Sequence, residues 1–156
     1  MEEQSLYSAV LRRKEAEQPE PVKPTAAVRD LMKPEPPLVA PEANFADIGA
    51  MFLKVRVNNI YVTEPGGRFV GAVSLHDIKP YLGDPALAEL VLARDIVHED
   101  FPRLAPEESL GDALGRFLGV TAERLPVVGG DGHLLGSLSK TDVLLTMMEK
   151  PKPAAA

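Results

Sequence analysis

Residues 125–144 have the sequence LPVVGGDGHLLGSLSKTDVL. Two apolar runs lie on either side of the glycine-rich GGDG, a pattern typical of a β-hairpin. After Ser139 the apolar residues follow helical spacing, with the serine in the position of a helix cap. The stretch therefore predicts two antiparallel strands that run directly into a helix. Residues 60–78, IYVTEPGGRFVGAVSLHDI, have the same plan, with Ser74 at the cap.

This correspondence is part of an internal repeat at an offset of 65 residues, without gaps. The matched positions include Arg29-Asp30 with Arg94-Asp95, Ala40-Pro41-Glu42 with Ala105-Pro106-Glu107, Phe52-Leu53 with Phe117-Leu118, Gly71 with Gly136, Ser74 with Ser139, and Asp77 with Asp142. Ahead of each hairpin lie a short apolar piece and a helical pattern. The sequence therefore predicts an α/β fold with two β-α-β-β-α units, residues 28–82 and 93–149, packed with pseudo-two-fold symmetry.

The segments outside these units have a different composition. Residues 1–27 begin with an apolar and basic stretch and continue as a proline-rich, charged linker. Residues 83–92 are predicted to form a connecting helix. In residues 150–156, KPKPAAA, the prolines break helices and remove backbone donors, so we expect a disordered tail.

Composition excludes several classes of function. A net charge of −6 would repel a polyphosphate backbone, and an aromatic content of 5% offers few platforms for base stacking, so no nucleic-acid partner is expected. The absence of cysteine excludes disulfides and thiolate metal sites and fits a reducing compartment. The apolar runs are far shorter than the roughly 20 residues that cross a bilayer, and no signal peptide opens the chain.

The pairs Ser74 with Asp77 and Ser139 with Asp142 have the spacing of a capping box. The same spacing begins the other helix of each unit, at Asn44 with Asp47 and at Ser109 with Asp112, so spacing alone does not separate a cap from a ligand site. The context separates them, because a glycine precedes each serine by three residues at the end of a strand, where a small residue lets a ligand approach the backbone. The hydroxyl suits a phosphate and the carboxylate suits paired ribose hydroxyls.

The repeat of these elements resembles a tandem pair of cystathionine β-synthase (CBS) domains, or Bateman module. Residues 125–144 carry most of the resemblance, and RDLM at 29–32 and RDIV at 94–97 are also typical of the family. The resemblance covers about residues 28–149. The resemblance implies two units packed sheet against sheet. It also implies clefts that bind AMP, ADP or ATP without chemical change, since the chain has no Walker-type loop.

The resemblance further implies which residues form each cleft. In one cleft Ser139 and Asp142 contact phosphate and ribose, and the adenine side comes from Val39, Val57, Asn58 and Tyr61 of the first unit. In the other cleft Ser74 and Asp77 have those roles, and the adenine side comes from Leu104, Ala122 and Pro126. Tyr61 stands where the family has a proline, as at Pro126, and a tyrosine there can stack on a base or fill the cleft. The nearby cationic or titratable side chains are Arg56, Arg68, Arg124, Lys140 and His76.

Three stretches narrow the resemblance further. Residues 6–18, 69–82 and 87–97 resemble the cytoplasmic tail of prokaryotic chloride channels and transporters of the CLC family. Arg12, Arg13 and Lys14 match the excess of positive charge on cytoplasmic flanks of membrane helices. This resemblance implies a cytoplasmic domain of an inner-membrane protein that forms homodimers and regulates ion transport by the transmembrane part of the same transporter.

No enzymatic activity is expected. His76, His98 and His133 have no second histidine or glutamate at the spacing of a zinc motif, so neither catalytic residues nor a metal site are predicted. Three functions stay open: a regulatory module that binds a nucleotide, a structural dimerisation and assembly domain of the transporter without ligand, and a free-standing CBS-pair sensor.

Overall fold

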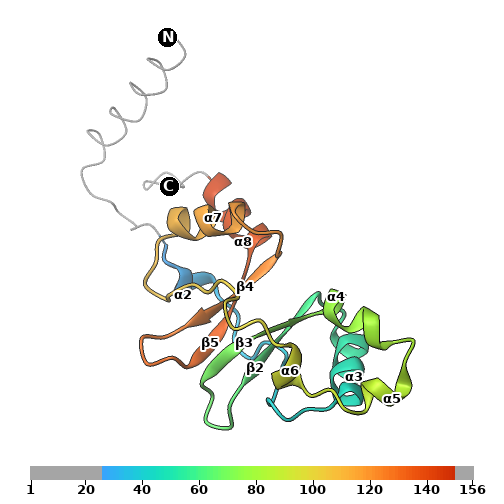
Figure 1. The fold of residues 1–156 in the computed structure, drawn as a ribbon. Helices are drawn as coiled ribbons and strands as arrows, with labels where there is room; N and C mark the ends of the chain where they lie inside the picture. Colours follow the sequence, from blue (N-terminus) through green and yellow to red (C-terminus); the bar gives the residue numbers. More distant parts are fainter. Residues whose placement is uncertain (1–25, 150–156) are drawn as a thin grey trace, which may run out of the picture.

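The computed structural model describes residues 26–149, in which the first unit has the predicted order of elements and the second has it except for the first strand (Figure 1). The first unit comprises β1 (Leu38–Val39), α3 (Phe45–Val55), β2 (Asn59–Thr63), β3 (Phe69–Ser74), α4 (Leu75–Ile78) and the 3-10 turn η1 (Lys79–Tyr81). The second comprises α7 (Leu110–Leu118), β4 (Arg124–Val128), β5 (Leu134–Ser139) and α8 (Lys140–Met148). Short helices precede each unit, α2 (Val28–Leu31) and α6 (Ala93–Ile96), and α5 (Pro85–Ala88) lies between the units. The predicted α/β fold class is confirmed.

The sheets repeat at the offset of 65 residues. In the first unit β1 pairs parallel with β2, with Val39 opposite Val62, and β2 pairs antiparallel with β3. In the second unit β4 and β5 form the same hairpin, and Leu104 makes a single parallel bridge to Val127 at the place of β1. The parallel strand of the second unit is thus reduced to one residue pair.

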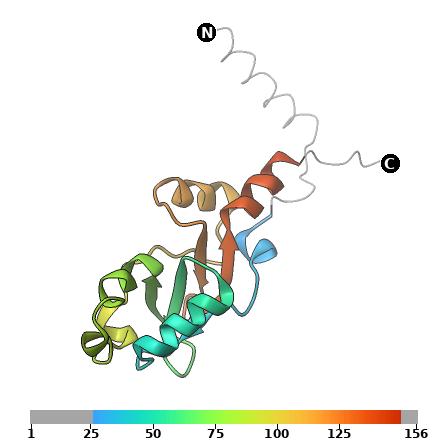
Figure 2. The same ribbon diagram turned by 90° about the vertical axis from the view of Figure 1, so that its right-hand side faces the viewer.

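Each unit has its own apolar core, built from equivalent positions. The first core is formed by Val39, Ile48, Phe52, Ile60, Val62, Val73, Ile78 and Ala93, and the second contains Leu104, Ala113, Phe117, Leu125, Val127, Leu138, Val143 and Val28 at the equivalent places. Strand residues alternate into these cores, and the helices contribute one apolar face. Figure 2 shows the helices packed on the outer sides of the two sheets.

Val28 and Ala93 show that the units are interlocked. Val28 of α2 lies in the core of the second unit, and Ala93 of α6 lies in the core of the first. We call residues 27–37 and 92–102 the first and second crossing segments, because each crosses to the opposite unit before its own unit begins.

Backbone hydrogen bonds fix both crossing segments to the strand that ends in the Ser-x-x-Asp motif. Lys33 exchanges hydrogen bonds of 2.8 and 2.9 Å with Ser137 of β5. His98 exchanges hydrogen bonds of 2.8 and 3.2 Å with Ala72 of β3. Each sheet therefore gains an edge partner from the opposite half of the chain, which leaves fewer unpaired backbone groups at the edge.

The packing of the fold requires glycine at positions 71 and 136, which differs from the role in ligand access expected for these residues. A Cβ atom added at Gly71 would lie 2.2 Å from the carbonyl oxygen of His98, and one at Gly136 would lie 2.5 Å from that of Lys33. Both distances are shorter than real Cβ contacts allow. The expectation that these glycines admit a ligand is therefore corrected, since the backbone of a crossing segment fills the space.

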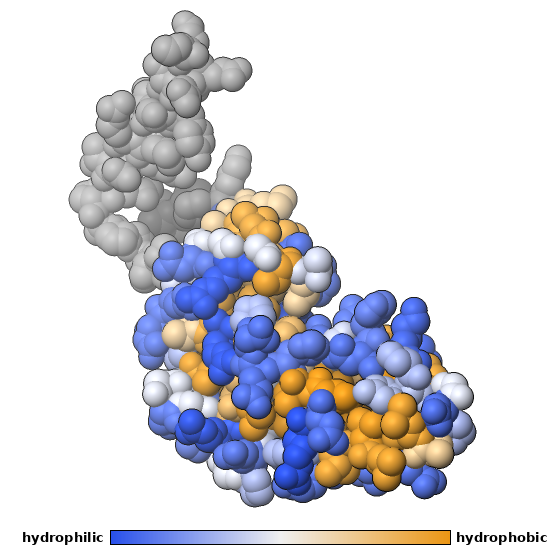
Figure 3. Space-filling model, viewed as in Figure 1, coloured by the Kyte–Doolittle hydropathy of each residue, from blue (hydrophilic) through white to orange (hydrophobic). Residues whose placement is uncertain are grey.

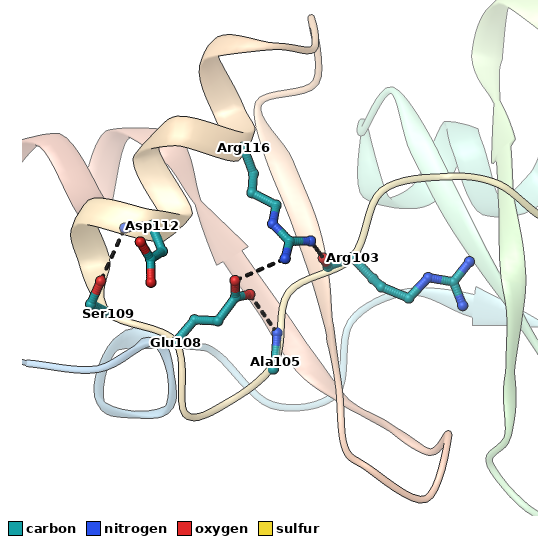
Figure 4. A network of polar contacts seen from close by, with 6 residues as sticks. All are labelled: Arg103, Ala105, Glu108, Ser109, Asp112 and Arg116. Atoms are coloured by element: carbon teal, nitrogen blue, oxygen red, sulfur yellow. Dashed lines mark hydrogen bonds and ion pairs between the residues drawn. The ribbon is translucent and has the colours of Figure 1, made fainter.

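The second crossing segment is followed by a network of polar contacts, drawn in Figure 4. The Arg116 guanidinium donates to the carbonyl oxygen of Arg103 at 2.7 Å and to Oε2 of Glu108 at 2.9 Å. Oε1 of Glu108 accepts from the Ala105 backbone at 2.8 Å. The Arg103 side chain lies 4.7 Å over the ring of Phe69 in the first unit. The positions equivalent to Arg103, Glu108 and Arg116 are Leu38, Ala43 and Met51, so the first unit cannot repeat this network.

Some of the predictions concern residues that lie beyond this range. Of the predicted juxtamembrane segment and linker, residues 1–25 lie outside the described residues, as does the tail at 150–156. Across residues 26–149, none of the helices has both the length and the apolar character needed to cross a membrane.

Candidate functional site

Two clefts lie between the units. Cleft 1 has a volume of about 400 Å³ and is lined by Lys33, Pro34, Glu35, Pro36, Pro37, Val55, Arg56, Val57, Asn58, Asn59, Tyr61, Glu123, Arg124 and Ser137. Cleft 2 has a volume of about 640 Å³ and is lined by Asn58, Asn59, Ser74, Leu75, His76, Ile78, Lys79, Leu82, Phe101, Pro102, Val120, Thr121 and Ala122. Volumes of this size accommodate small organic ligands.

The clefts are related by the repeat. In cleft 1 the end of the first crossing segment and the turn after α3 face β4 and β5 of the second unit. In cleft 2 the end of the second crossing segment and the turn after α7 face the first unit. Asn58 and Asn59 line both clefts. Each cleft therefore takes one wall from each unit, so a ligand in either would contact both halves of the chain.

The predicted adenine-side residues are divided between clefts and cores. Val57, Asn58 and Tyr61 line cleft 1, and Ala122 lines cleft 2. Val39, Leu104 and Pro126 do not line either cleft, because their side chains are buried within the packed interior. The structure thus places predicted residues of the turn after the first helix of each unit in a cleft, whereas these three other predicted residues are buried away from both clefts.

Tyr61 fills the interface between the units. Its side chain is 3% exposed and lies edge-on to Phe69, with 5.9 Å between ring centroids, and 6.4 Å from Phe101 of the second crossing segment. Burial raises the pKa of its hydroxyl above the usual value, although the Arg124 charge opposes this. Of the two roles open for this tyrosine, the packing favours filling over stacking on a base.

Ser74 and Asp77 form a complete capping box. Ser74 Oγ accepts from the His76 backbone at 3.0 Å, and the Ser74 backbone donates to Oδ2 of Asp77 at 3.1 Å. Nε2 of His98 lies 2.8 Å from the same Oδ2. Ser74 lines cleft 2, whereas Asp77 does not, and its carboxylate faces the second crossing segment instead.

Ser139 and Asp142 form only half of a capping box. Ser139 Oγ accepts from the Asp142 backbone at 3.1 Å, and no group of residues 26–149 forms a hydrogen bond or ion pair with the Asp142 carboxylate. Neither residue lines cleft 1. The repeated spacing therefore gives two different local structures.

The charges of the two clefts also differ. Cleft 1 carries three cations, Lys33, Arg56 and Arg124, beside Glu35 and Glu123. Arg124 donates to Ser137 Oγ at 3.1 Å, which orients its guanidinium. Cleft 2 has Lys79 and the imidazole of His76, and the rest of its lining combines apolar residues with the uncharged polar residues Asn58, Asn59, Ser74 and Thr121. Cleft 1 is therefore the more suitable for an anion of high charge, and cleft 2 for a flat apolar group.

Backbone strain is concentrated at cleft 1. Among residues 26–149, Glu35 and Arg56 are the non-glycine residues with positive φ, at 54° and 51°, and both line this cleft. A left-handed backbone at a non-glycine residue costs on the order of 1 kcal/mol. Within the same range no group of three His, Asp or Glu side chains is placed to hold a metal ion.

Parts of the crossing segments form cleft walls that were not predicted from the sequence. They are residues 33–37 in cleft 1 and residues 101–102 in cleft 2. These residues precede the first strand of each unit, in a part of the sequence where no periodicity indicates a functional element. The repeated proline, Pro37 and Pro102, is the one signal in the sequence that sets these positions apart.

Comparison with known protein families supports the resemblance seen in the sequence. A family model described as the CBS domain matches residues 28–84 and again residues 93–149. A search of curated proteins found no match. Neither this family model nor the solved structures named below link the chain to a chloride channel.

Solved structures have the same fold. CBSX2, a CBS-pair protein from Arabidopsis thaliana, in complex with AMP, is 25% identical, with a TM-score of 0.67, covering 79% of this chain and 96% of that chain. A CBS domain-containing protein of unknown function from Bacillus anthracis is 22% identical, with a TM-score of 0.72, covering 80% and 94%. The CBS domain of a bacterial CNNM/CorC family Mg²⁺ transporter, in complex with ATP, is 20% identical, with a TM-score of 0.66, covering 76% and 84%.

Proposed function

The chain belongs to the CBS domain family as a tandem pair, and from this premise we propose that it is a regulatory module that binds an adenine nucleotide between its two units. The observation that carries the proposal is the shared construction of the clefts, each of which takes one wall from each unit. A ligand there contacts both halves at once. AMP, ADP and ATP are the ligands proposed, and binding rather than catalysis is the proposed activity.

Regulation follows if the nucleotide binds one arrangement of the units better than another. A ligand shifts such an equilibrium only by its difference in affinity for the two arrangements. The crossing segments provide the mechanical link, because each is hydrogen-bonded to one unit and continues into the other. Movement at a cleft wall is therefore transmitted to both cores.

The chemistry of the linings supports an adenine nucleotide. Phe101, Pro102 and Val120 give cleft 2 an apolar wall that suits a purine. Lys33, Arg56 and Arg124 give cleft 1 cations that suit phosphates. We further propose that Asp77 and Asp142 reach the ribose after a small movement toward their clefts. The AMP complex of CBSX2 and the ATP complex of the Mg²⁺ transporter domain are consistent with this ligand class.

A thermal shift and a calorimetric titration with AMP, ADP and ATP test the proposal on the 156-residue chain. A ligand at about 100 times its dissociation constant stabilises the fold by roughly 2.7 kcal/mol, which raises the melting temperature measurably. No shift and no heat with any of the three nucleotides contradicts the proposed function.

Two pairs of aspartate variants separate ligand binding from helix capping. Asp77→Ala and Asp142→Ala should each weaken binding in one cleft. Asp47→Ala and Asp112→Ala are matched controls, since these residues have the same capping position at α3 and α7 and line neither cleft. If all four variants bind as the natural chain does, the proposed ribose contacts are wrong.

A membrane transporter of the CLC type is the more specific regulatory target that we propose, and residues 6–18, 69–82 and 87–97 carry this resemblance. A solved structure supports the free-standing alternative. The match to a putative acetoin utilization protein from Vibrio cholerae extends over 100% of that protein's chain in the structure. An antibody against residues 26–149, applied to separated cell fractions, distinguishes them. A larger membrane-bound protein supports the transporter, and a protein of about this length in the soluble fraction supports the free-standing sensor.

We also propose a homodimer formed through the outer helices. Leu53 of α3 and Leu118 of α7 are equivalent positions with side chains 75% and 73% exposed. Figure 3 shows apolar surface over the α7–α8 end and the α3–α5 end of the molecule. Light scattering of Leu53→Glu and Leu118→Glu tests this. A dimer that persists in both variants contradicts these interfaces, and a dimer without nucleotide binding favours a purely structural role in assembly.

A further inference from the structure

A side-chain contact that the proposed function does not explain joins His98 to Asp77. Nε2 of His98 lies 2.8 Å from Oδ2 of Asp77, with the two side chains 52% and 26% exposed. The residues lie 21 positions apart, and His98 comes from the second crossing segment. The contact therefore ties this segment to the start of α4, beside cleft 2.

This contact is not a necessary result of the fold. The backbone pairing of His98 with Ala72 is repeated at Lys33 with Ser137. Lys33, however, forms no ion pair with Asp142, the equivalent of Asp77, within the described residues. The backbone arrangement thus occurs twice, and the side-chain contact occurs in one half.

With this contact in place, Asp77 does not line cleft 2. Ser74, His76 and Ile78 line the cleft, but Asp77 between them does not. Its Oδ2 atom already accepts from the Ser74 backbone and lies against His98. Each carboxylate oxygen accepts about two hydrogen bonds, so the Ser74 backbone and His98 together occupy Oδ2, and release of His98 would free one of its sites for a ribose hydroxyl.

We propose that His98 is a latch that competes with ribose hydroxyls for the Asp77 carboxylate, so that a nucleotide entering cleft 2 releases the His98 side chain. The inference rests on the proposed function and adds a regulatory step to it. In the free protein the latch is closed and lowers the affinity of cleft 2. In the bound protein His98 is free, and because Phe101 and Pro102 of the same segment line this cleft, occupancy is signalled to the second unit.

Calorimetry on the 156-residue chain tests the competition, with AMP and an AMP analogue that lacks both ribose hydroxyls as probes. His98→Ala should bind AMP more tightly at cleft 2 by about two- to fivefold, the strength of a partly exposed ion pair. The analogue should show no gain, because it cannot use the released carboxylate. His133→Ala is the matched control, because it removes another histidine–aspartate contact, with Asp131 at 3.3 Å, at a residue that lines neither cleft, and it should show no gain that depends on the ribose hydroxyls.

NMR of the histidine rings gives a second measurement that does not depend on a variant. The chain has 3 histidines, so variant spectra assign each ring. Saturation with AMP should move the His98 signal in the same direction as Asp77→Asn does without ligand. If AMP binds while the His98 signal stays unchanged and His98→Ala gains no affinity, the proposed competition between His98 and the ribose is wrong, and the proposed function stands. If no variant binds any nucleotide, both are overturned.

Discussion

Replacement of Gly71 by alanine tests the interlocked arrangement of the two units. The new Cβ atom would lie 2.2 Å from the carbonyl oxygen of His98, 2.8 Å from its carbonyl carbon and 2.9 Å from Cγ2 of Val97. Two of these neighbours are backbone atoms, which cannot turn aside as a side chain does. The second crossing segment must therefore move away from β3.

The cost follows from the contacts that this movement breaks. Ala72 and His98 exchange two backbone hydrogen bonds, of 3.2 and 2.8 Å. The net contribution of each is about 0.5–1.5 kcal/mol, and the strain of an added methyl group in a packed site is about 1–3 kcal/mol. Gly71→Ala should therefore lower the free energy of unfolding by about 2–6 kcal/mol, a large part of the roughly 5–15 kcal/mol typical of a whole protein.

Urea denaturation followed by circular dichroism measures this change, and the chain supplies its own controls. Gly49 in α3 and Gly115 in α7 have no atom within 4 Å of an added Cβ. Alanine favours a helix interior over glycine, so Gly49→Ala and Gly115→Ala should raise the free energy of unfolding by about 0.5–1 kcal/mol each. Gly136→Ala should resemble Gly71→Ala, because its Cβ would lie 2.5 Å from the Lys33 carbonyl oxygen.

Comparison of the four variants tests whether the crossing segments pack against β3 and β5. All are the same chemical change, so differences in the unfolded chain cancel to a first approximation. If Gly71→Ala and Gly136→Ala are as stable as the two helix variants, the crossing segments do not lie against β3 and β5, and the account of the interlocked fold is refuted.

Two other changes probe the interface and the network in Figure 4. Because burial raises the pKa of Tyr61, its contribution to stability is complete below the usual tyrosine pKa of about 10 and is lost as the pH rises beyond it, by about 1.4 kcal/mol per pH unit. Tyr61→Phe should lack this loss when urea denaturation is compared at pH values of about 9 and 11, and an equal alkaline loss in both chains contradicts the assignment. Arg116→Met, which introduces the residue at the equivalent position of the first unit, should cost about 1–3 kcal/mol because Glu108 loses its partner. The control Arg94→Met removes an exposed pair at 3.7 Å and should change stability by less than about 1 kcal/mol, and equal effects of the two changes would count against the network.

The elements of this fold could be predicted because their signals are local. The helix caps at Asn44 and Ser109, the glycine turns and the alternation of apolar residues are all read within one unit, and the repeat supplies each signal twice. The crossing segments could not be predicted in the same way. They are held to the strands by single bridges, Lys33 with Ser137 and His98 with Ala72, between residues from opposite halves of the chain, and a single bridge leaves no periodicity in the sequence.

The candidate site could be predicted only in part, because its sequence signals are also local. The Ser-x-x-Asp pattern locates the start of a helix, but it does not say where the carboxylate points. In α4 the Asp77 carboxylate closes the capping box and contacts His98, whereas in α8 the Asp142 carboxylate does neither. The contact with His98 depends on the side chain at one position of a crossing segment, which is histidine in one half and lysine in the other.

The repeated backbone and the unrepeated side chains together explain how one fold can hold two unlike clefts. The backbone bridges of the crossing segments occur at equivalent positions in both halves, so the walls of the clefts have the same construction. The residues on those walls differ, with Arg56 of cleft 1 replaced by Thr121 in cleft 2, and Lys33 by His98 beside it. Because a ligand is selected by the side chains and the units are joined by the backbone, ligands of different charge in the two clefts would act on the same pair of crossing segments. The arrangement therefore allows two binding events to be combined in one conformational response, provided that each ligand prefers one arrangement of the units.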